Sequence, residues 1–397
     1  SKKIGRRRGL IIAAALFLFS AVGSSMPEMF MRPIGEGDHT FIYVFVMYRI
    51  IGGIGVGLAS MLSPLYIAEI APAEMRGKLV SLNQLAIVGG ILLVYFVNYF
   101  IAEQGDSNWL NTVGWRWMFA SEVIPAAIFL FFLMFVPNTP RFLVLKSQPE
   151  KALEVLVKVN GQKKAEEILE NIKGTVVNNA GKLFSYGTFV IVIGILLAVF
   201  QQFVGINVVL YYAPEIFKSM GSGTDTALLQ TIIVGAINVI FTLVAIQTVD
   251  KYGRKPLMII GALGMSIAMF SLGITFFTQT TGILAILCML LYVASFAMSW
   301  GPVTWVLLSE IFPNKIRGQA MAVAVALQWV SNYIVSWSFP IMDKNSYLVE
   351  TFNHGFAYWI YGAMGILAML FVWKFVPETK GKTLEDMDDL WKKKSKD

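Results

Sequence analysis

The chain is poor in the residues that catalysis and metal binding usually need. Its 397 residues include one cysteine, Cys288, and two histidines, and only 14% of them are charged. One cysteine excludes a disulfide framework within the chain and any zinc site built from cysteine pairs. A soluble domain carries charge on about a quarter of its residues, so a water-soluble enzyme is not expected. The net charge of +7 is modest and does not indicate nucleic acid as a partner, and no cofactor or metal is expected.

Long apolar runs fill the chain instead, and 56% of its residues are hydrophobic. A helix needs about 20 residues to cross the hydrocarbon core of a bilayer. These runs also lack the alternation of membrane barrel strands, so each is predicted to be a helix. The fold class is therefore predicted to be an all-α membrane protein with about ten transmembrane helices. The runs are 9–26, 41–62, 79–102, 116–136, 184–218, 227–248, 257–278, 281–309, 320–340 and 353–376.

Lysine and arginine set the predicted orientation, because they gather on the cytoplasmic side of membrane proteins. If each run crosses once, few basic residues fall in outer loops or within spans, and all the others lie on the side of the N-terminus. Both termini are therefore predicted to be cytoplasmic, in a multi-pass protein of the inner (plasma) membrane. The exceptions are Arg32, Arg49, Arg116, Lys218 and Lys344.

One sizeable block, 139–182, lies outside the predicted spans. Its segments 142–146, 151–159 and 163–172 mix apolar and charged residues with helical spacing, which predicts short cytoplasmic helices.

An internal repeat divides the chain. Glu69-Ile70-x-Pro72-x-x-x-Arg76-Gly77 returns 241 residues later at Glu310, and Phe135-Val136-Pro137-x-Thr139 returns 240 residues later at Phe375. Both copies of the first motif fall on predicted cytoplasmic turns, as parallel halves of a transporter would require.

The two halves are unequal. Two spans precede Gly253-Arg254-Lys255 in the second half, whereas the matching Gly5-Arg6-Arg7 stands at the start of the chain. We therefore expect that the first two helices of a twelve-helix, six-plus-six protein are missing from this sequence. The predicted domains are an N-terminal transmembrane half (1–138), a cytoplasmic helical linker (139–182), a C-terminal transmembrane half (183–378) and a cytoplasmic tail (379–397).

These motifs resemble the major facilitator superfamily and, within it, the sugar porter family. The most specific ones are Gln201-Gln202-x-x-Gly205-x-Asn207 and Pro377-Glu378-Thr379-Lys380-Gly381, and the resemblance covers the whole chain. It implies two six-helix halves that rock about a central sugar site. Stretches 48–63 and 296–317 are most similar to the branch that moves pentoses with protons. The family's usual Glu in the Pro-Glu-Ser-Pro-Arg motif is replaced here by Asn138.

The resemblance implies a monomeric, proton-coupled symporter whose partners are a sugar, protons and the lipid bilayer, with D-xylose or a related aldose as the substrate. Two alternatives stay open. Ile91 stands where facilitative relatives carry Ile and proton-coupled ones can carry Gln, which favours a sugar uniporter. A non-transporting sugar sensor on the same fold is the other alternative.

Uncharged amides inside the predicted spans are the candidate sugar ligands. Polar side chains at bilayer depth are costly and call for a reason, and an amide offers a sugar hydroxyl both a donor and an acceptor. The alternative is that such amides only join helices by hydrogen bonds. With the family pattern, the predicted substrate-binding residues are Gln84, Gln201, Gln202, Asn207, Trp305 and Gln328.

Two charged residues in the first half are candidates for proton coupling. Arg49 and Glu122 lie in or at the edge of spans, where each is expected to have a partner. The resemblance implies that Arg49 acts with an acid on the absent first helix. A purely structural pair between Arg49 and Glu122 is the alternative.

Charges at matching places in the two repeats are predicted to form a cytoplasmic gate, a latch between the halves. Topology signalling by the basic members alone is the alternative. The gate residues are Glu69, Arg76, Arg141, Arg254, Glu310, Arg317 and Glu378.

Overall fold

The computed structural model describes residues 4–29, 31–32, 41–72, 76–177, 183–313, 316–380 and 390–391, without some side chains such as that of Arg76. Within these ranges the regular secondary structure is helical, apart from one isolated bridge between Met29 and Arg32. The predicted all-α fold is therefore confirmed.

Ten helical segments of the described chain are long and apolar enough to cross a membrane, as the sequence predicts. They are Arg6–Ser25, Ile42–Ile67, Leu82–Ala102, Ser107–Leu133, Phe189–Tyr211, Thr224–Tyr252, Arg254–Phe277, Ile283–Ile311, Arg317–Asp343 and Phe356–Phe375.

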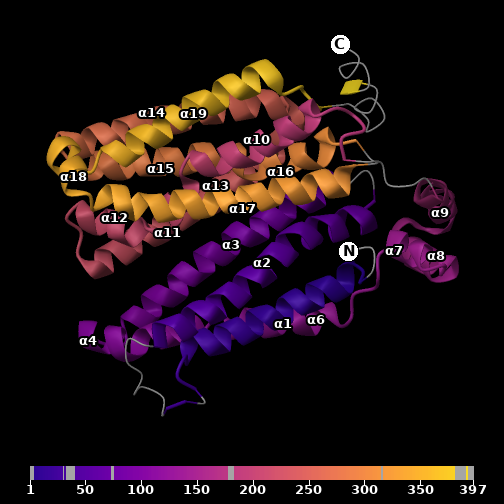
Figure 1. Cartoon of the computed structure of the whole chain (residues 1–397), viewed down its shortest axis with the longest axis horizontal. Helices are drawn as coiled ribbons and strands as arrows, with labels where there is room; N and C mark the ends of the chain where they lie inside the picture. Colours follow the sequence, from indigo (N-terminus) through magenta and orange to yellow (C-terminus); the bar gives the residue numbers. More distant parts are fainter. Residues whose placement is uncertain are drawn as a thin grey trace. The chain divides into compact units, whose positions relative to one another are not determined.

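The chain divides into two compact units (Figure 1). Unit 1 comprises Ser1–Asn83 and Phe96–Asn179, and unit 2 comprises Gln84–Tyr95 and Ala180–Asp397. The helix α3 (Arg76–Ala102) contributes to both units.

Unit 1 is built around α1, which packs against α2 and α6. Leu10 and Ala14 of α1 meet Leu62 of α2 and Leu133 of α6 in a small buried cluster. In the apolar segment by which each helix could cross a membrane, 6% of the residues of α2 are buried, against half of those of α1. The described part of unit 1 therefore leaves most of α2 uncovered. The helices are α1 (Arg6–Ser25), α2 (Ile42–Ile70), α4 (Ser107–Trp109), the π-helix η3 (Leu110–Gly114), α5 (Trp115–Ala120), α6 (Val123–Leu133), α7 (Pro140–Leu145), α8 (Pro149–Asn160) and α9 (Gln162–Val177).

The helices α7 to α9 confirm the short helices predicted after the first half. They share a buried cluster of their own, in which Leu143, Leu156 and Leu169 pack together. Their other faces carry the charged residues, as amphipathic helices outside a membrane require.

Unit 2 is more tightly packed. In it α14, α15 and α19 lie side by side, and α10 runs along α17 (Figure 1). Large side chains such as Trp300, Tyr292 and Tyr358 are fully buried in its core. The helices are α10 (Phe189–Phe203), α11 (Ile206–Tyr211), α12 (Ala213–Ser219), α13 (Thr224–Tyr252), α14 (Arg254–Phe277), α15 (Ile283–Ala297), α16 (Trp300–Ile311), α17 (Arg317–Asp343), α18 (Ser346–Phe352) and α19 (Phe356–Phe375).

Two spans of unit 2 are interrupted, and both interruptions matter for the site. Gly205, with a left-handed φ of 92°, separates α10 from α11. The break between α15 and α16 falls at 298–299, just before Gly301-Pro302. Pro302 explains this place, because it has no N–H to bond the carbonyl of Met298 four residues earlier.

Candidate functional site

The amides predicted from the second half come together in unit 2. Gln201, near the end of α10, donates from Nε2 to the carbonyl oxygens of Trp300 (2.9 Å) and Gly301 (3.3 Å). Those carbonyls stand at the start of α16, beside the break between α15 and α16. Gln201 therefore ties α10 to this break, in addition to any role toward a ligand.

The other glutamines converge on the same side chain. Gln328 of α17 donates from Nε2 to Oε1 of Gln201, and Gln202 donates to the same oxygen at 3.4 Å. Both residues are more than nine-tenths buried. The Oε1 of Gln328 has no hydrogen-bond partner among the described residues. A buried acceptor left without a partner costs about 1–3 kcal/mol, so a ligand hydroxyl at this atom would be favourable.

The turn at Gly205 adds the fourth amide. It brings Asn207, at the start of α11, within reach of Gln202, and Nδ2 of Asn207 donates to Oε1 of Gln202 at 2.5 Å. Because Gly205 has a positive φ and an added Cβ would lie 2.7 Å from the Tyr361 ring, only glycine fits this turn.

The remaining predicted ligands make no described hydrogen bond to this cluster. Trp305 is half-buried on α16, and Gln84 is half-buried on α3, within unit 2. The structure thus joins Gln201, Gln202, Asn207 and Gln328 in one network. Sugar binding by all six residues stays a prediction.

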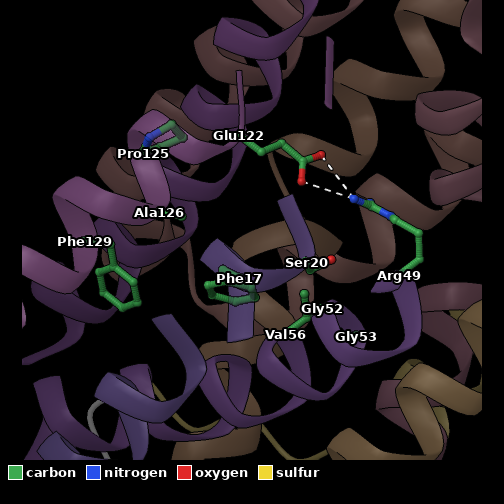
Figure 2. Close-up of a pocket in the computed structure, with 10 residues that line it drawn as sticks. All are labelled: Phe17, Ser20, Arg49, Gly52, Gly53, Val56, Glu122, Pro125, Ala126 and Phe129. Carbon is green, nitrogen blue, oxygen red and sulfur yellow. Dashed lines mark hydrogen bonds and ion pairs between the residues drawn. The ribbon is translucent and has the colours of Figure 1, made fainter. Parts of the chain in front are cut away.

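Arg49 and Glu122 contact each other in unit 1. Nη1 of Arg49 lies 3.1 Å from Oε2 of Glu122, and the guanidinium lies 5.0 Å from the centre of the Phe119 ring. Both side chains line a cavity of about 370 Å³. Figure 2 shows them joined to each other at this cavity, with Ser20 nearby. Each of the pair is about two-fifths exposed, so the charges remain reachable from this cavity.

One predicted gate residue of unit 1, Glu69, forms an ion pair inside that unit, with Arg6 as its partner. Nη2 of Arg6, at the start of α1, lies 2.6 Å from Oε1 of Glu69 at the end of α2. Both side chains are nearly buried. Arg141 is exposed on α7, and the side chain of Arg76 lies outside the described residues.

Unit 2 repeats this ion pair. Nη2 of Arg254, at the start of α14, lies 3.0 Å from Oε1 of Glu310 at the end of α16. Thr379 donates to the other oxygen of Glu310, at 2.6 Å. Arg317 donates to the carbonyl of Phe312. These described pairs each join helix ends within one unit, and a latch between the halves stays a prediction.

Glu378 acts as a cap for α14, a role that its place in the sequence did not indicate. Its carboxylate accepts the backbone N–H groups of Arg254 (3.1 Å) and Lys255 (2.9 Å) at the first turn of that helix. Partial burial by itself would raise the pKa of Glu378, but backbone N–H donors from Lys380, Arg254, Lys255 and Thr379 outweigh it and lower the pKa.

The equivalent position of unit 1 is filled differently. An added Cβ at Gly253 would meet the Glu378 carboxylate at 2.8 Å, whereas at Gly5 it would meet the ring of Phe142 at the same distance. The first turn of α1 is thus covered by an aromatic ring, consistent with Asn138 replacing the acid expected there.

A buried ion pair in unit 1 escaped the sequence analysis. Nη2 of Arg116 lies 2.7 Å from Oε1 of Glu28, whose side chain is fully buried, and Nη1 also donates to the carbonyl of Ser25. A sign of this pair in the sequence is that Arg116 is one of the few basic residues predicted to lie on the outer side. In the part of the chain that the structure describes, no three His, Cys, Asp or Glu side chains gather to hold a metal ion.

Known proteins are similar to this chain in sequence and fold. A family model described as "Sugar (and other) transporter" matches residues 1–391. The chain is 62% identical to the D-xylose-proton symporter of Escherichia coli, over 100% of this chain and 82% of the relative. It is 42% identical to the glucose facilitated diffusion protein of Zymomonas mobilis and 39% identical to the arabinose-proton symporter of Bacillus subtilis, each over 98% of this chain and 82% of the relative.

A solved structure agrees with these sequence matches. The proton:xylose symporter XylE bound to 6-bromo-6-deoxy-D-glucose superimposes with a TM-score of 0.89, at 62% identity, over 98% of this chain and 84% of that one. Together with the repeat and the ten spanning segments, these matches show that the chain belongs to the sugar transporter family of the major facilitator superfamily.

Proposed function

We propose that this protein is a proton-coupled sugar symporter of the inner membrane, which imports D-xylose or a similar aldose by alternating access. The sugar is moved without any covalent change. The observation that carries the substrate class is the uncharged, buried amide network of unit 2, with an acceptor on Gln328 left unpaired. The 62% identity to a D-xylose-proton symporter supports the specific sugar and the coupling ion.

The amide network suits a neutral polyol. A sugar hydroxyl both donates and accepts, so it inserts between groups of the two kinds without leaving a buried charge. Oε1 of Gln328 accepts one hydroxyl, while Gln202 and Asn207 exchange part of their mutual hydrogen bond for bonds to the sugar. Trp305 offers a flat apolar face to the C–H side of the ring.

Coupling is assigned to the first half. The Arg49–Glu122 pair faces a cavity and holds opposite charges where a proton can change the balance. Proton arrival at the acidic partner removes its negative charge and frees Arg49 for another partner. Such a change of partner would switch the protein between two states, and binding of either the proton or the sugar can shift the equilibrium between them.

A facilitative uniporter is the second candidate. Ile91 of α3 packs against the core of unit 2 with an apolar side chain, where the family can carry an amide. The similarity to a glucose facilitated diffusion protein fits the same reading.

Sugar-dependent proton uptake separates the two candidates. Purified protein is placed in lightly buffered proteoliposomes, and D-xylose is added outside while the external pH is followed. A symporter makes the outside more alkaline as sugar enters, and L-glucose gives no signal. Sugar entry without any pH change would establish the uniporter.

A further inference from the structure

Three tyrosine hydroxyls of unit 2 donate to backbone carbonyls at places where a proline or the Gly205 turn disturbs the helical hydrogen bonding. Tyr95 donates to Leu210 at 2.7 Å, Tyr212 donates to Ser336 at 3.1 Å, and Tyr292 donates to Val204 at 2.7 Å. The three tyrosines come from three different parts of the unit, and each hydroxyl reaches across to another helix. At each of the three places the carbonyl is available because it lacks its usual helical N–H donor.

Proline explains two of the free carbonyls. In a helix, the carbonyl of Leu210 would accept from residue 214 and that of Ser336 from residue 340. Both of these positions are proline, which has no N–H to donate. Helix-breaking residues are tolerated in membranes only where neighbouring groups satisfy the released backbone, and a tyrosine hydroxyl does this at each site.

The glycine turn explains the third. Gly205 takes a left-handed conformation, and the first described helical bond beyond it runs from the N–H of Val209 to the carbonyl of Gly205 at 3.2 Å. The carbonyl of Val204 therefore lies before the new helix, facing α15. Tyr292, which is 1% exposed, supplies its donor from that helix.

We propose that Tyr292 is a positioning residue for sugar binding: it does not touch the sugar, and it holds the turn on which two of the binding amides stand. Val204 is two residues after Gln202 and three before Asn207, so its carbonyl lies between them in the chain. Those two amides share the 2.5 Å hydrogen bond across the turn, and their mutual geometry depends on its shape. The predicted effect on sugar affinity rests on the proposed function. The predicted effect on the structure of the turn does not.

Removing the hydroxyl gives a defined change. Tyr292→Phe keeps the ring in the core and leaves the Val204 carbonyl buried without its donor. The backbone at 204–205 then rotates toward another donor, which turns Gln202 and Asn207 away from their shared geometry. The expected loss of D-xylose affinity is roughly five-fold to 150-fold, the range for an orphaned buried carbonyl.

The chain offers a matched control. Tyr361 of α19 packs its ring against the same Gly205, and its hydroxyl is buried without a hydrogen-bond partner among the described residues. Tyr361→Phe deletes the same atom beside the same turn, but no bond is lost. It is expected to leave affinity and stability unchanged, or to raise stability slightly.

The first measurement compares binding with turnover. Affinity for D-xylose is measured by calorimetry on the purified full chain, and counterflow in proteoliposomes gives KM and the maximal rate. In Tyr292→Phe, Kd and KM should rise together while the maximal rate stays within about two-fold, as loss of uniform binding predicts. A lower maximal rate at unchanged Kd, or an equal effect of Tyr361→Phe, would show a merely structural residue and overturn the proposal.

The second measurement needs no sugar. Spin labels on cysteines placed at Ser219, the end of α12, and Thr278, just after α14, report how firmly the segment after the turn is held within unit 2. The background is Cys288→Ser. Tyr292→Phe should broaden the distance distribution, and Tyr361→Phe should leave it as in the parent. If the distribution broadens but the parent protein binds no D-xylose, the role of Tyr292 in holding the turn is supported and the proposed function fails. An unchanged distance distribution in Tyr292→Phe overturns the proposed role of Tyr292, whatever its affinity for D-xylose.

Discussion

Asn207 donates to Gln202 across the turn at Gly205, so two predicted sugar ligands are joined before any ligand arrives. The bond exists because Gly205 interrupts the span between α10 and α11 with a left-handed turn. A sugar that binds here meets amides already fixed in direction, which lowers the entropy lost on binding. The same arrangement makes the site sensitive to every contact that shapes the turn.

Truncation of the amides tests the site. Asn207→Ala and Gln202→Ala should each weaken D-xylose binding by about five-fold or more, because each leaves a partner amide and a sugar hydroxyl unpaired, at about 1–3 kcal/mol. Calorimetry on folded protein gives the affinities. Gln162→Ala, an exposed amide on α9, is the matched control. Equal affinities in both site variants and the control would move the sugar away from the Gly205 turn.

Gly205→Ala should damage both folding and binding. The left-handed φ is unfavourable for alanine by about 1–2 kcal/mol, and its Cβ would also press on the Tyr361 ring. Gly221→Ala separates the two effects, because Gly221, just after α12, has a φ of 95° and open space around it. Thermal unfolding should show a clearly larger loss for Gly205→Ala, and similar losses would mean that the close packing at Gly205 contributes little.

Arg49→Leu should abolish uphill sugar accumulation and spare sugar binding. The variant removes the cation that pairs with Glu122 at the cavity, whereas the amide network of unit 2 is untouched. Uptake driven by an imposed pH gradient and calorimetry on the same preparation measure the two properties. Lys173→Leu, which breaks the exposed pair with Glu170 on α9, controls for loss of a charge. Full accumulation by Arg49→Leu would leave the pair a structural role only.

The Glu378 cap should make stability depend on pH in a defined direction. Because its pKa is lowered in the folded protein, the cap stabilises fully above the ordinary value of 4.5, and the contribution is lost as pH falls through the folded pKa. Glu378→Gln should therefore lower the apparent Tm at pH 7, and the gap from the parent should shrink on acidification. Glu154→Gln, which changes an exposed carboxylate on α8, is the control. A gap that is the same at pH 7 and at the lowest pH tolerated would show that the charge of Glu378 is irrelevant.

The spans were predictable because apolar length decides whether a helix can cross a bilayer, and little else competes with that signal. The short helices α7 to α9 were predictable for a similar reason, since their periodic apolar residues have only one way to be buried. The sequence also marks Gln201 and Gln202 as unusual, because buried amides are costly.

Partnerships across the fold were harder to predict. Gln201 binding the carbonyl of Trp300 depends on a break whose place is set by Pro302, and Tyr292 looks in the sequence like any core aromatic. The role of its hydroxyl becomes clear only when the structure places it beside the Val204 carbonyl, to which it donates. The cap made by Glu378 likewise needs two segments, more than 120 residues apart, to be seen together.

Gradient-driven accumulation tests the central claim most directly. Proteoliposomes of the purified chain are loaded at a neutral internal pH, diluted into an acidic buffer with labelled D-xylose, and compared with liposomes diluted at equal pH. The account predicts an internal sugar concentration above the external one only when the gradient is present, with collapse on addition of a protonophore. Equilibration to the external concentration, at the same final level with and without the gradient, would contradict proton-coupled symport.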